Sequence, residues 1–285
     1  SWLVKPLISE LESRGESESF DIQNLVFAQD RVTRYIPMSV LFDGQNYLVE
    51  NYTLHTVLSA ALTNTTDQLG PVQSSSILGL GLSQSMPGFS ALPNVEEELN
   101  GIIKTDIESN QGIYPGRIFL NEQFTFDTLA QNLRGNRILH IATHSEFVPI
   151  QDGESYILLG NGKPLRVASP DPLINDIDSL DTDLADLHLV VLSACQTALG
   201  GRSLDGTEIA GVSSSFLGKN KAEAVLASLW RVSDVGSSTL MQRFYEILGT
   251  GQVTKAEALR QAQLSLLRGE EDIAERLEAV RNGDI

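Results

Sequence analysis

Residues 187–197 read LHLVVLSACQT, an apolar run that leads into Cys195, the single cysteine of the chain. A second apolar run, residues 138–143 (ILHIAT), is followed directly by His144, 51 residues before that cysteine. Short apolar runs of this kind are typical of strands buried in a parallel sheet. Open α/β sheets place their sites at the carboxyl ends of the strands, so Cys195 and His144 meet at one sheet edge if the two strands are parallel neighbours or nearly so.

Strand and helix patterns alternate along the rest of the chain, which predicts a mostly parallel sheet covered on both faces by helices. Two capping-box patterns, Asn94 with Glu97 and Thr254 with Glu257, indicate helix starts. Further strands are expected at residues 25–28, 38–42, 47–49, 77–82, 116–120, 156–159 and 222–229, with a hairpin turn at 43–44. Helices are expected from Asn94 onward and at residues 125–133, 206–217, 237–248 and 254–267.

The composition narrows the classes of partner. The chain has 285 residues, 41% of them hydrophobic, and carries 37 acidic against 20 basic residues, a net charge of −17. This excess argues against nucleic acid as the main partner and weakly favours basic ligands. No apolar stretch approaches the roughly 18 residues of a transmembrane helix, so we expect no membrane partner.

The single cysteine and the N-terminus suggest where the protein works. One cysteine cannot form an internal disulfide, which favours a reducing, cytoplasmic compartment. The N-terminus lacks the pattern of a signal peptide. The chain starts with serine and enters apolar sequence at once, so we expect it to be part of a longer protein.

The four histidines differ in how well they could serve a cysteine nucleophile. His55 has no chemical neighbours in the sequence and is expected to be structural. His188 begins the cysteine strand, so about seven residues of 3.3 Å each place it roughly 23 Å from Cys195, at the wrong sheet edge. His140 lies inside its strand, as a hydrogen-bonded core residue would. Only His144 follows the end of a strand.

A Cys/His pair has a clear chemical use. A free thiol has a pKa of about 8.5, and a neighbouring imidazole can take its proton and later protonate a leaving amine. Backbone N–H groups near Cys195 and Ser145 could hold the developing oxyanion. The alternative is a buried cysteine packed as a small hydrophobe, and spacing alone leaves both open. The polar neighbours Ser193 and Gln196 favour a site.

Cofactor and metal motifs are missing from the sequence. There is no cysteine pair and no His-Glu-x-x-His, so we expect no metal site. Residues 78–81 (LGLG) lack the third glycine of a dinucleotide loop, and no phosphate-binding loop occurs. We therefore expect no cofactor.

Three blocks together resemble the hallmark motifs of CHAT domains: residues 140–144 (HIATH), 192–200 (LSACQTALG) and 227–234 (ASLWRVSD). CHAT domains are caspase-like cysteine peptidase domains, related to separases, that often follow tetratricopeptide repeats. The resemblance is weak before residue 75 and strong after 136. It implies a single domain over residues 1–285 with a three-layer α/β/α sandwich of the caspase type. Residues 1–135 would be its less diagnostic part and 136–285 its catalytic part.

The same resemblance implies roles for individual residues. It implies that His144 is the base and Cys195 the nucleophile of an endopeptidase for one specific protein, regulated by upstream repeats or by a partner. Asp234 would face the pocket for a basic substrate side chain, with capping of the following helix as the alternative. Trp230 would line the substrate groove or pack in the core.

One position departs from the family pattern. Ser145 stands where the family often has glycine, although its N–H remains available to a substrate. The second reading is therefore a catalytically silent, caspase-like interaction module.

Overall fold

The computed structural model describes residues 6, 10, 22–29, 33, 36–57, 69–106, 108, 111–146, 156–166, 177–180, 184–193, 216–217, 221–228 and 233–269.

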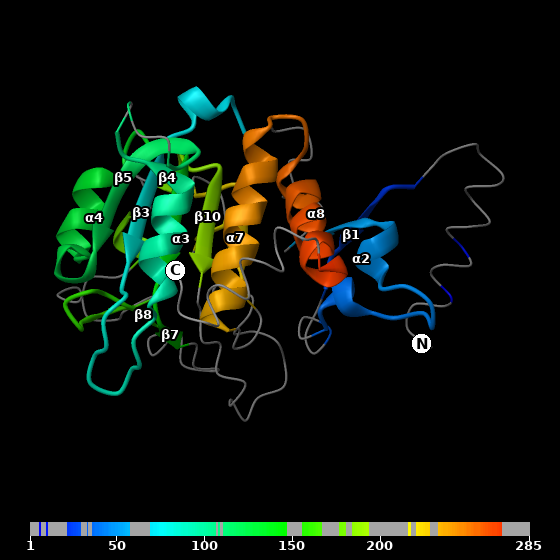
Figure 1. Cartoon of the computed structure of the whole chain (residues 1–285), viewed down its shortest axis with the longest axis horizontal. Helices are drawn as coiled ribbons and strands as arrows, with labels where there is room; N and C mark the ends of the chain where they lie inside the picture. The colour runs from blue at the N-terminus through cyan, green and yellow to red at the C-terminus, as the bar shows by residue number, and fades with distance from the viewer. Residues whose placement is uncertain are drawn as a thin grey trace.

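A six-stranded, all-parallel sheet forms the centre of the molecule (Figure 1). Its strand order is β11-β10-β6-β3-β5-β4. The strands are β3 (Ile77–Gly81), β4 (Ile103–Lys104), β5 (Tyr114–Leu120), β6 (Ile138–Ala142), β10 (Leu189–Ser193) and β11 (Val225–Ala227). All residues of β3, β6 and β10 are buried, as their largely apolar sequences predict.

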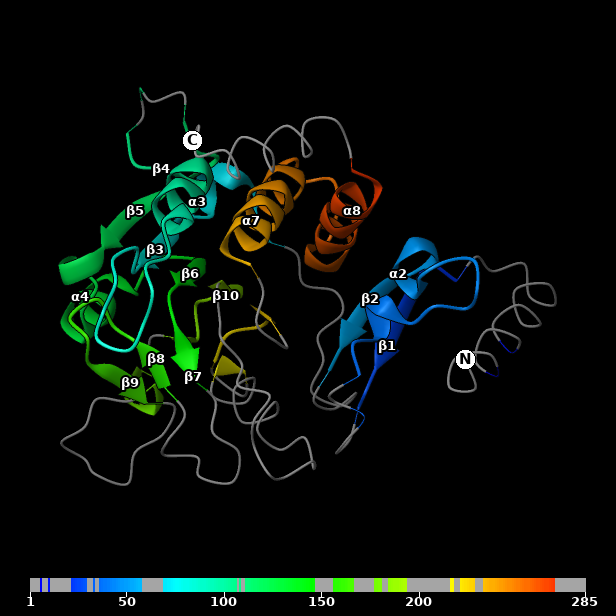
Figure 2. The ribbon, with the colours of Figure 1, turned by 60° about the horizontal axis from the view of Figure 1, so that its bottom comes forward.

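Helices cover both faces of this sheet, which confirms the expected layered α/β architecture. On one face, α3 (Asn94–Ile102) and α7 (Asp234–Gly249) pack side by side, with α8 (Lys255–Arg268) next to α7 (Figure 2). On the other face, α4 (Phe126–Asn132) packs against apolar side chains of β3 and β6. Two hydrophobic cores result, one on each side of the sheet.

A small antiparallel sheet continues directly from β6 at the carboxyl edge of the central sheet. It has the order β7-β8-β9, with β7 (Ser145–Glu146), β8 (Tyr156–Leu158) and β9 (Pro164–Arg166). Ser145 lies opposite Ile157 in this sheet. The strand expected at residues 156–159 is thereby confirmed.

The N-terminal residues form a separate small unit beside α8. Its parallel strands β1 (Asn24–Phe27) and β2 (Thr53–Thr56) pack with α2 (Leu48–Asn51) around buried Leu25 and Leu48. The prediction of strands at 38–42 and 47–49 is wrong, since a 3-10 turn (Met38–Val40) and α2 occupy these positions. A single bridge between Phe42 and Tyr47 preserves the predicted turn at 43–44.

Three further 3-10 turns complete the described elements. They are η4 (Val72–Ser74), η5 (Asn121–Gln123) and η6 (Asp178–Leu180). Among the described helices, none combines the length and the apolar character needed to cross a bilayer.

The two predicted capping boxes have different outcomes. Thr254 caps α8 and accepts a hydrogen bond from the N–H of Glu257, as expected. Asn94 does not cap α3, because Pro93 occupies the cap position and the Asn94 side chain bonds to Asp234 instead. A tertiary partner has replaced the local one.

Candidate active site

The strand order of the central sheet reverses around β3. From β3 the chain moves to β4 and β5 on one side, and then to β6, β10 and β11 on the other. Such switch points leave a crevice at the carboxyl ends of the strands, where α/β proteins bind their ligands. The loop after β3 and the residues after β6 meet there, since the N–H of Leu82 donates to the carbonyl of Ala142 at 3.0 Å.

His144 lies at this edge, two residues after the end of β6, with its side chain fully buried. Its Nε2 lies 2.8 Å from the carbonyl oxygen of Ser90, and its ring centroid lies 5.0 Å from that of Phe89. A carbonyl only accepts hydrogen bonds, so Nε2 carries the hydrogen of the neutral ring. Nδ1 is then the basic nitrogen.

The main chain around His144 is fixed as well. The N–H of Leu158 in β8 donates to the carbonyl of His144 at 2.9 Å, and the hydroxyl of Thr143 donates to the carbonyl of Leu158 at 2.8 Å. These bonds hold Thr143 and the main chain of His144 against β8. The loop after β3 contacts the His144 side chain, and β8 fixes its backbone.

The loop that carries Ser90 is itself anchored by Asn121, directly after β5. The Asn121 side-chain oxygen accepts hydrogen bonds from the N–H groups of Ser83 and Gln84 at 3.0 and 3.2 Å. Asn121 has φ +53°, a left-handed conformation that asparagine tolerates better than most residues. Sequence reasoning missed both residues. For Ser90 no signal exists, because every residue has a carbonyl.

Cys195 and Trp230 lie outside the described residues, but the strand that leads to Cys195 is described. β10 pairs directly with β6, with Ser193 opposite Ala142. Cys195 follows β10 by two residues, as His144 follows β6. The two apolar runs are therefore parallel neighbours, which is the arrangement under which His144 and Cys195 are expected to meet.

Two serine hydroxyls are buried at this edge without a partner. Ser145 is 2% exposed and Ser193 is 3% exposed, and neither hydroxyl oxygen forms a hydrogen bond in the described structure. A buried polar group without a partner has a cost in stability of about 1–3 kcal/mol. Ser145 follows His144 directly, and Ser193 is the last residue of the strand that leads to Cys195. Both buried hydroxyls, with their cost in stability, therefore lie beside the candidate pair.

Asp234 is the first residue of α7, and its role differs from the helix cap considered above. Ser233 is the cap, accepting from the N–H of Gly236 at 3.0 Å. Oδ2 of Asp234 accepts two hydrogen bonds from Asn94, from its N–H at 3.0 Å and its side-chain amide at 2.7 Å. Oδ1 is buried without a hydrogen-bond partner in the described structure. The carboxylate thus joins the N-termini of α3 and α7, where negative charge is favourable.

The other three histidines occupy the structural positions expected for them. His140 is buried in β6 between Glu98 and Tyr245. His188 lies directly before β10, at the opposite edge of the sheet, with Nδ1 3.0 Å from a carboxylate oxygen of Glu223. His55 lies in β2, where burial lowers its pKa. None of the three lies at the carboxyl edge.

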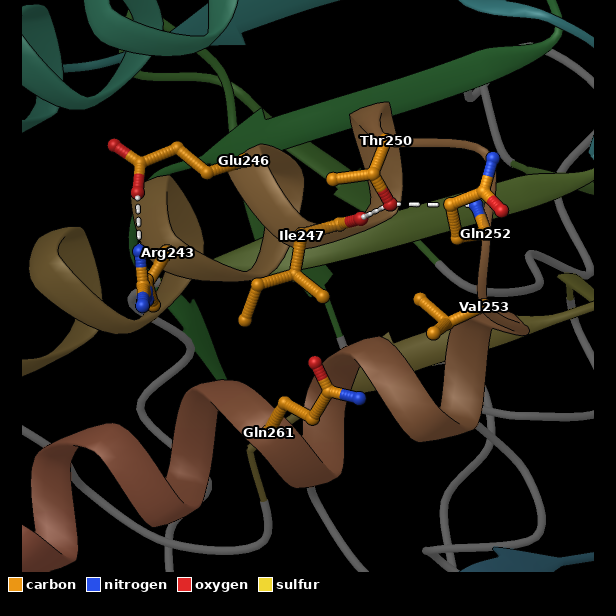
Figure 3. Close-up of a pocket in the computed structure, with 7 residues that line it drawn as sticks. All are labelled: Arg243, Glu246, Ile247, Thr250, Gln252, Val253 and Gln261. Carbon is orange, nitrogen blue, oxygen red and sulfur yellow. Dashed lines mark hydrogen bonds and ion pairs between the residues drawn. The ribbon is translucent and has the colours of Figure 1, made fainter.

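A groove of about 420 Å³ lies between the C-terminal half of α7 and the first half of α8 (Figure 3). Arg243 and Glu246 form an ion pair of 3.2 Å on its wall, and Gln261 faces it from α8. Arg243, the groove residue nearest to Asp234 along α7, follows it by nine residues, about 14 Å at 1.5 Å each. The groove is therefore distinct from the His144 edge.

Comparison with known proteins agrees with this geometry. A family model described as CHAT domain matches residues 1–277. No curated protein matches the chain. With a match over nearly its whole length and a six-stranded parallel sheet at its centre, the chain belongs to the CHAT family, a caspase-like, protease-related family.

Proposed function

We propose that this protein is a cysteine endopeptidase in which Cys195 is the nucleophile and His144 the base. The observation that carries the proposal is the register of β6 and β10. Ala142 lies opposite Ser193, and each strand is followed two residues later by one member of the pair. Adjacent strands are about 4.8 Å apart, a separation that side chains can bridge.

The geometry of His144 supports the chemistry of both half-reactions. Nδ1 takes the thiol proton, and the thiolate sulfur attacks the carbonyl carbon of the scissile peptide. The imidazolium then gives the proton to the leaving amine, which leaves a thioester on Cys195. Water attacks this thioester with His144 again as base, releasing the acid and the free thiol. The bond to Ser90 keeps the hydrogen on Nε2 throughout.

We infer a specific protein substrate with a basic residue before the cut bond. Oδ1 of Asp234 is the oxygen that Asn94 leaves available, and a carboxylate oxygen can accept a charge-assisted hydrogen bond from Arg. In the same proposal, Trp230 lines the substrate groove and the N–H of Ser145 binds the substrate. Upstream repeats or a regulatory partner control access, in a cytoplasmic compartment that keeps the thiol reduced.

The test is the rate at which a thiol-reactive peptide probe ending in Arg labels Cys195, measured against pH. In the parent protein we expect labelling with a midpoint below the pKa of about 8.5 of a free thiol. His144→Gln should slow labelling about 100-fold or more, because general-base assistance is lost. His55→Gln is the matched control and should label like the parent, since His55 lies in the N-terminal unit.

A different labelling result would contradict the proposed dyad. A Cys195 that titrates like a free thiol, and labels equally fast in His144→Gln, contradicts the dyad. That result would favour the catalytically silent interaction module.

A further inference from the structure

A network of side-chain hydrogen bonds, called the circuit below, connects β6, the strand that precedes His144, with α3 and α7. Nε2 of His140 lies 2.7 Å from Oε1 of Glu98 on α3, and its Nδ1 lies 3.1 Å from the hydroxyl of Tyr245 on α7. The two helices are joined again at their N-termini by Asn94 and Asp234. Three elements are therefore connected pairwise by side-chain hydrogen bonds.

Burying these polar side chains costs more free energy of folding than apolar side chains at the same positions would. Glu98 is 1% exposed, and His140 and Tyr245 are 0% exposed. Burying ionisable groups has a desolvation cost that apolar side chains of similar volume avoid. Burial raises the pKa of Tyr245 well above its ordinary value of 10.0, so its hydroxyl stays neutral and able to donate. Such a group contributes defined geometry more than it contributes stability.

The circuit is connected to His144, the candidate base, in two ways. His140 precedes His144 by four residues on the same chain segment. Glu98 lies on α3, and the loop immediately before α3 carries the Ser90 carbonyl that bonds Nε2 of His144. A shift of α3 along β6 would move that carbonyl away from the imidazole.

We infer that Glu98, His140 and Tyr245 are positioning residues for His144. By holding α3 and α7 against β6, they keep the Ser90 carbonyl on Nε2 and so maintain the tautomer whose basic nitrogen is Nδ1. The catalytic meaning of this device rests on the proposed function, but the positioning itself does not.

The test is ¹⁵N NMR of histidine-labelled protein, the full 285-residue chain, at about pH 8, where an ordinary imidazole is neutral. A His144→Gln spectrum assigns the His144 signals. In the parent we expect His144 as the Nε2–H tautomer. Glu98→Leu should convert it to a mixture of tautomers, while Glu98→Gln, which keeps a hydrogen bond to His140, should largely restore the parent spectrum. Glu96→Leu is the control on the same helix, because Glu96 is exposed.

Tyr245→Phe provides a second variant, which keeps the ring and removes only the hydroxyl, should Glu98→Leu fold poorly. Its His144 signals should shift in the same direction. A network that only stabilises the fold would lower the unfolding midpoint and leave the His144 tautomer unchanged. Parent-like His144 signals in the folded Glu98→Leu or Tyr245→Phe protein would overturn the inference.

Kinetics separate this inference from the proposed function. With active peptidase, Glu98→Leu should lower kcat about 10- to 100-fold and leave KM unchanged, as expected for a misplaced base. A parent without any peptidase activity, but with the expected tautomer changes, would remove the proposed function and keep the positioning role. An active parent whose kcat is unaffected in Glu98→Leu and in Tyr245→Phe would remove the positioning role and keep the proposed function.

Discussion

At the scale of single residues, the two oxygens of Asp234 have different surroundings. Oδ2 is occupied by Asn94, whereas Oδ1 is buried without a hydrogen-bond partner in the described structure. Asp234→Asn removes the charge that would hold Arg before the cut bond, so we expect the preference for basic residues to fall sharply. A peptide library that varies only this position measures the change. Cleavage should become slower for Arg and Lys substrates alone.

Asn94→Ala is the matched control for Asp234. It removes the side-chain amide bond to Oδ2 but keeps the backbone N–H bond and the carboxylate, so the preference for Arg should persist. The loss of a hydrogen bond to a charged group should lower the free energy of unfolding by about 1.5–3 kcal/mol, which denaturant unfolding measures. If Asp234→Asn keeps the parent preference and only loses stability, the carboxylate is a helix–helix clamp and no part of the substrate pocket.

At the scale of elements, β3 depends on glycine for its contact with α3. A methyl group on Gly81 would lie 2.6 Å from Val95 and 2.8 Å from Leu99, both on α3, and 2.9 Å from Leu120. We expect Gly81→Ala to lower the free energy of unfolding by roughly 1–3 kcal/mol, because α3 must move away from the sheet. Denaturant unfolding followed by circular dichroism measures this loss.

Gly101→Ala, on α3 itself, is the opposite control. The three atoms nearest to its methyl group would all belong to the flexible side chain of Gln242, at 3.1–3.4 Å. Alanine is favoured over glycine in helices, so this variant should be more stable by up to about 1 kcal/mol. Equal losses for Gly81→Ala and Gly101→Ala would show that close helix–sheet packing is not the cause.

At the scale of the whole molecule, Arg260 connects the N-terminal unit to α8. Its guanidinium donates to the carbonyls of Val49 at 2.8 Å and Glu50 at 2.6 Å. We expect Arg260→Ala to speed amide hydrogen exchange in residues 36–57 about tenfold or more, since each such bond contributes about 1.5–3 kcal/mol. Exchange in β10 should stay unchanged. Arg268→Ala, exposed on the same helix, should exchange like the parent.

The same contact should depend on pH through Glu257. Burial alone raises the pKa of this carboxyl group, but hydrogen bonds from Thr53 and Gln261 and the charge of Arg260 outweigh burial and lower it below 4.5. A carboxylate with a lowered pKa in the folded state stabilises above its unfolded pKa and loses that contribution as the pH falls through the folded pKa. Exchange in β2 should therefore accelerate on acidification below about pH 4.5, and Glu257→Gln should weaken this dependence. An equal acceleration in Glu257→Gln would assign the effect to other carboxyl groups.

The buried strands and the position of the candidate base follow from the amino-acid sequence alone. Residues 77–81, 138–142 and 189–193 are apolar except for His140 and Ser193, and runs of this kind are typical of strands buried between two layers of helices. The prediction of strands at residues 38–42 and 47–49 is wrong, because short segments of mixed polarity fit a strand, a 3-10 turn and one helical turn equally well. His144 follows directly from its position after a buried run.

The groups that surround that histidine depend on the tertiary fold. The strand order places β6 between β3 and β10, and this order brings the Ser90 carbonyl onto His144 across 54 residues of sequence. Asn94 and Asp234 are 140 residues apart, and each has a plausible local role that its distant partner replaces. The physical reason is that hydrogen-bond donors and acceptors, backbone carbonyls above all, are available along the entire chain, so a pairing between distant groups exists only once packing has brought them together.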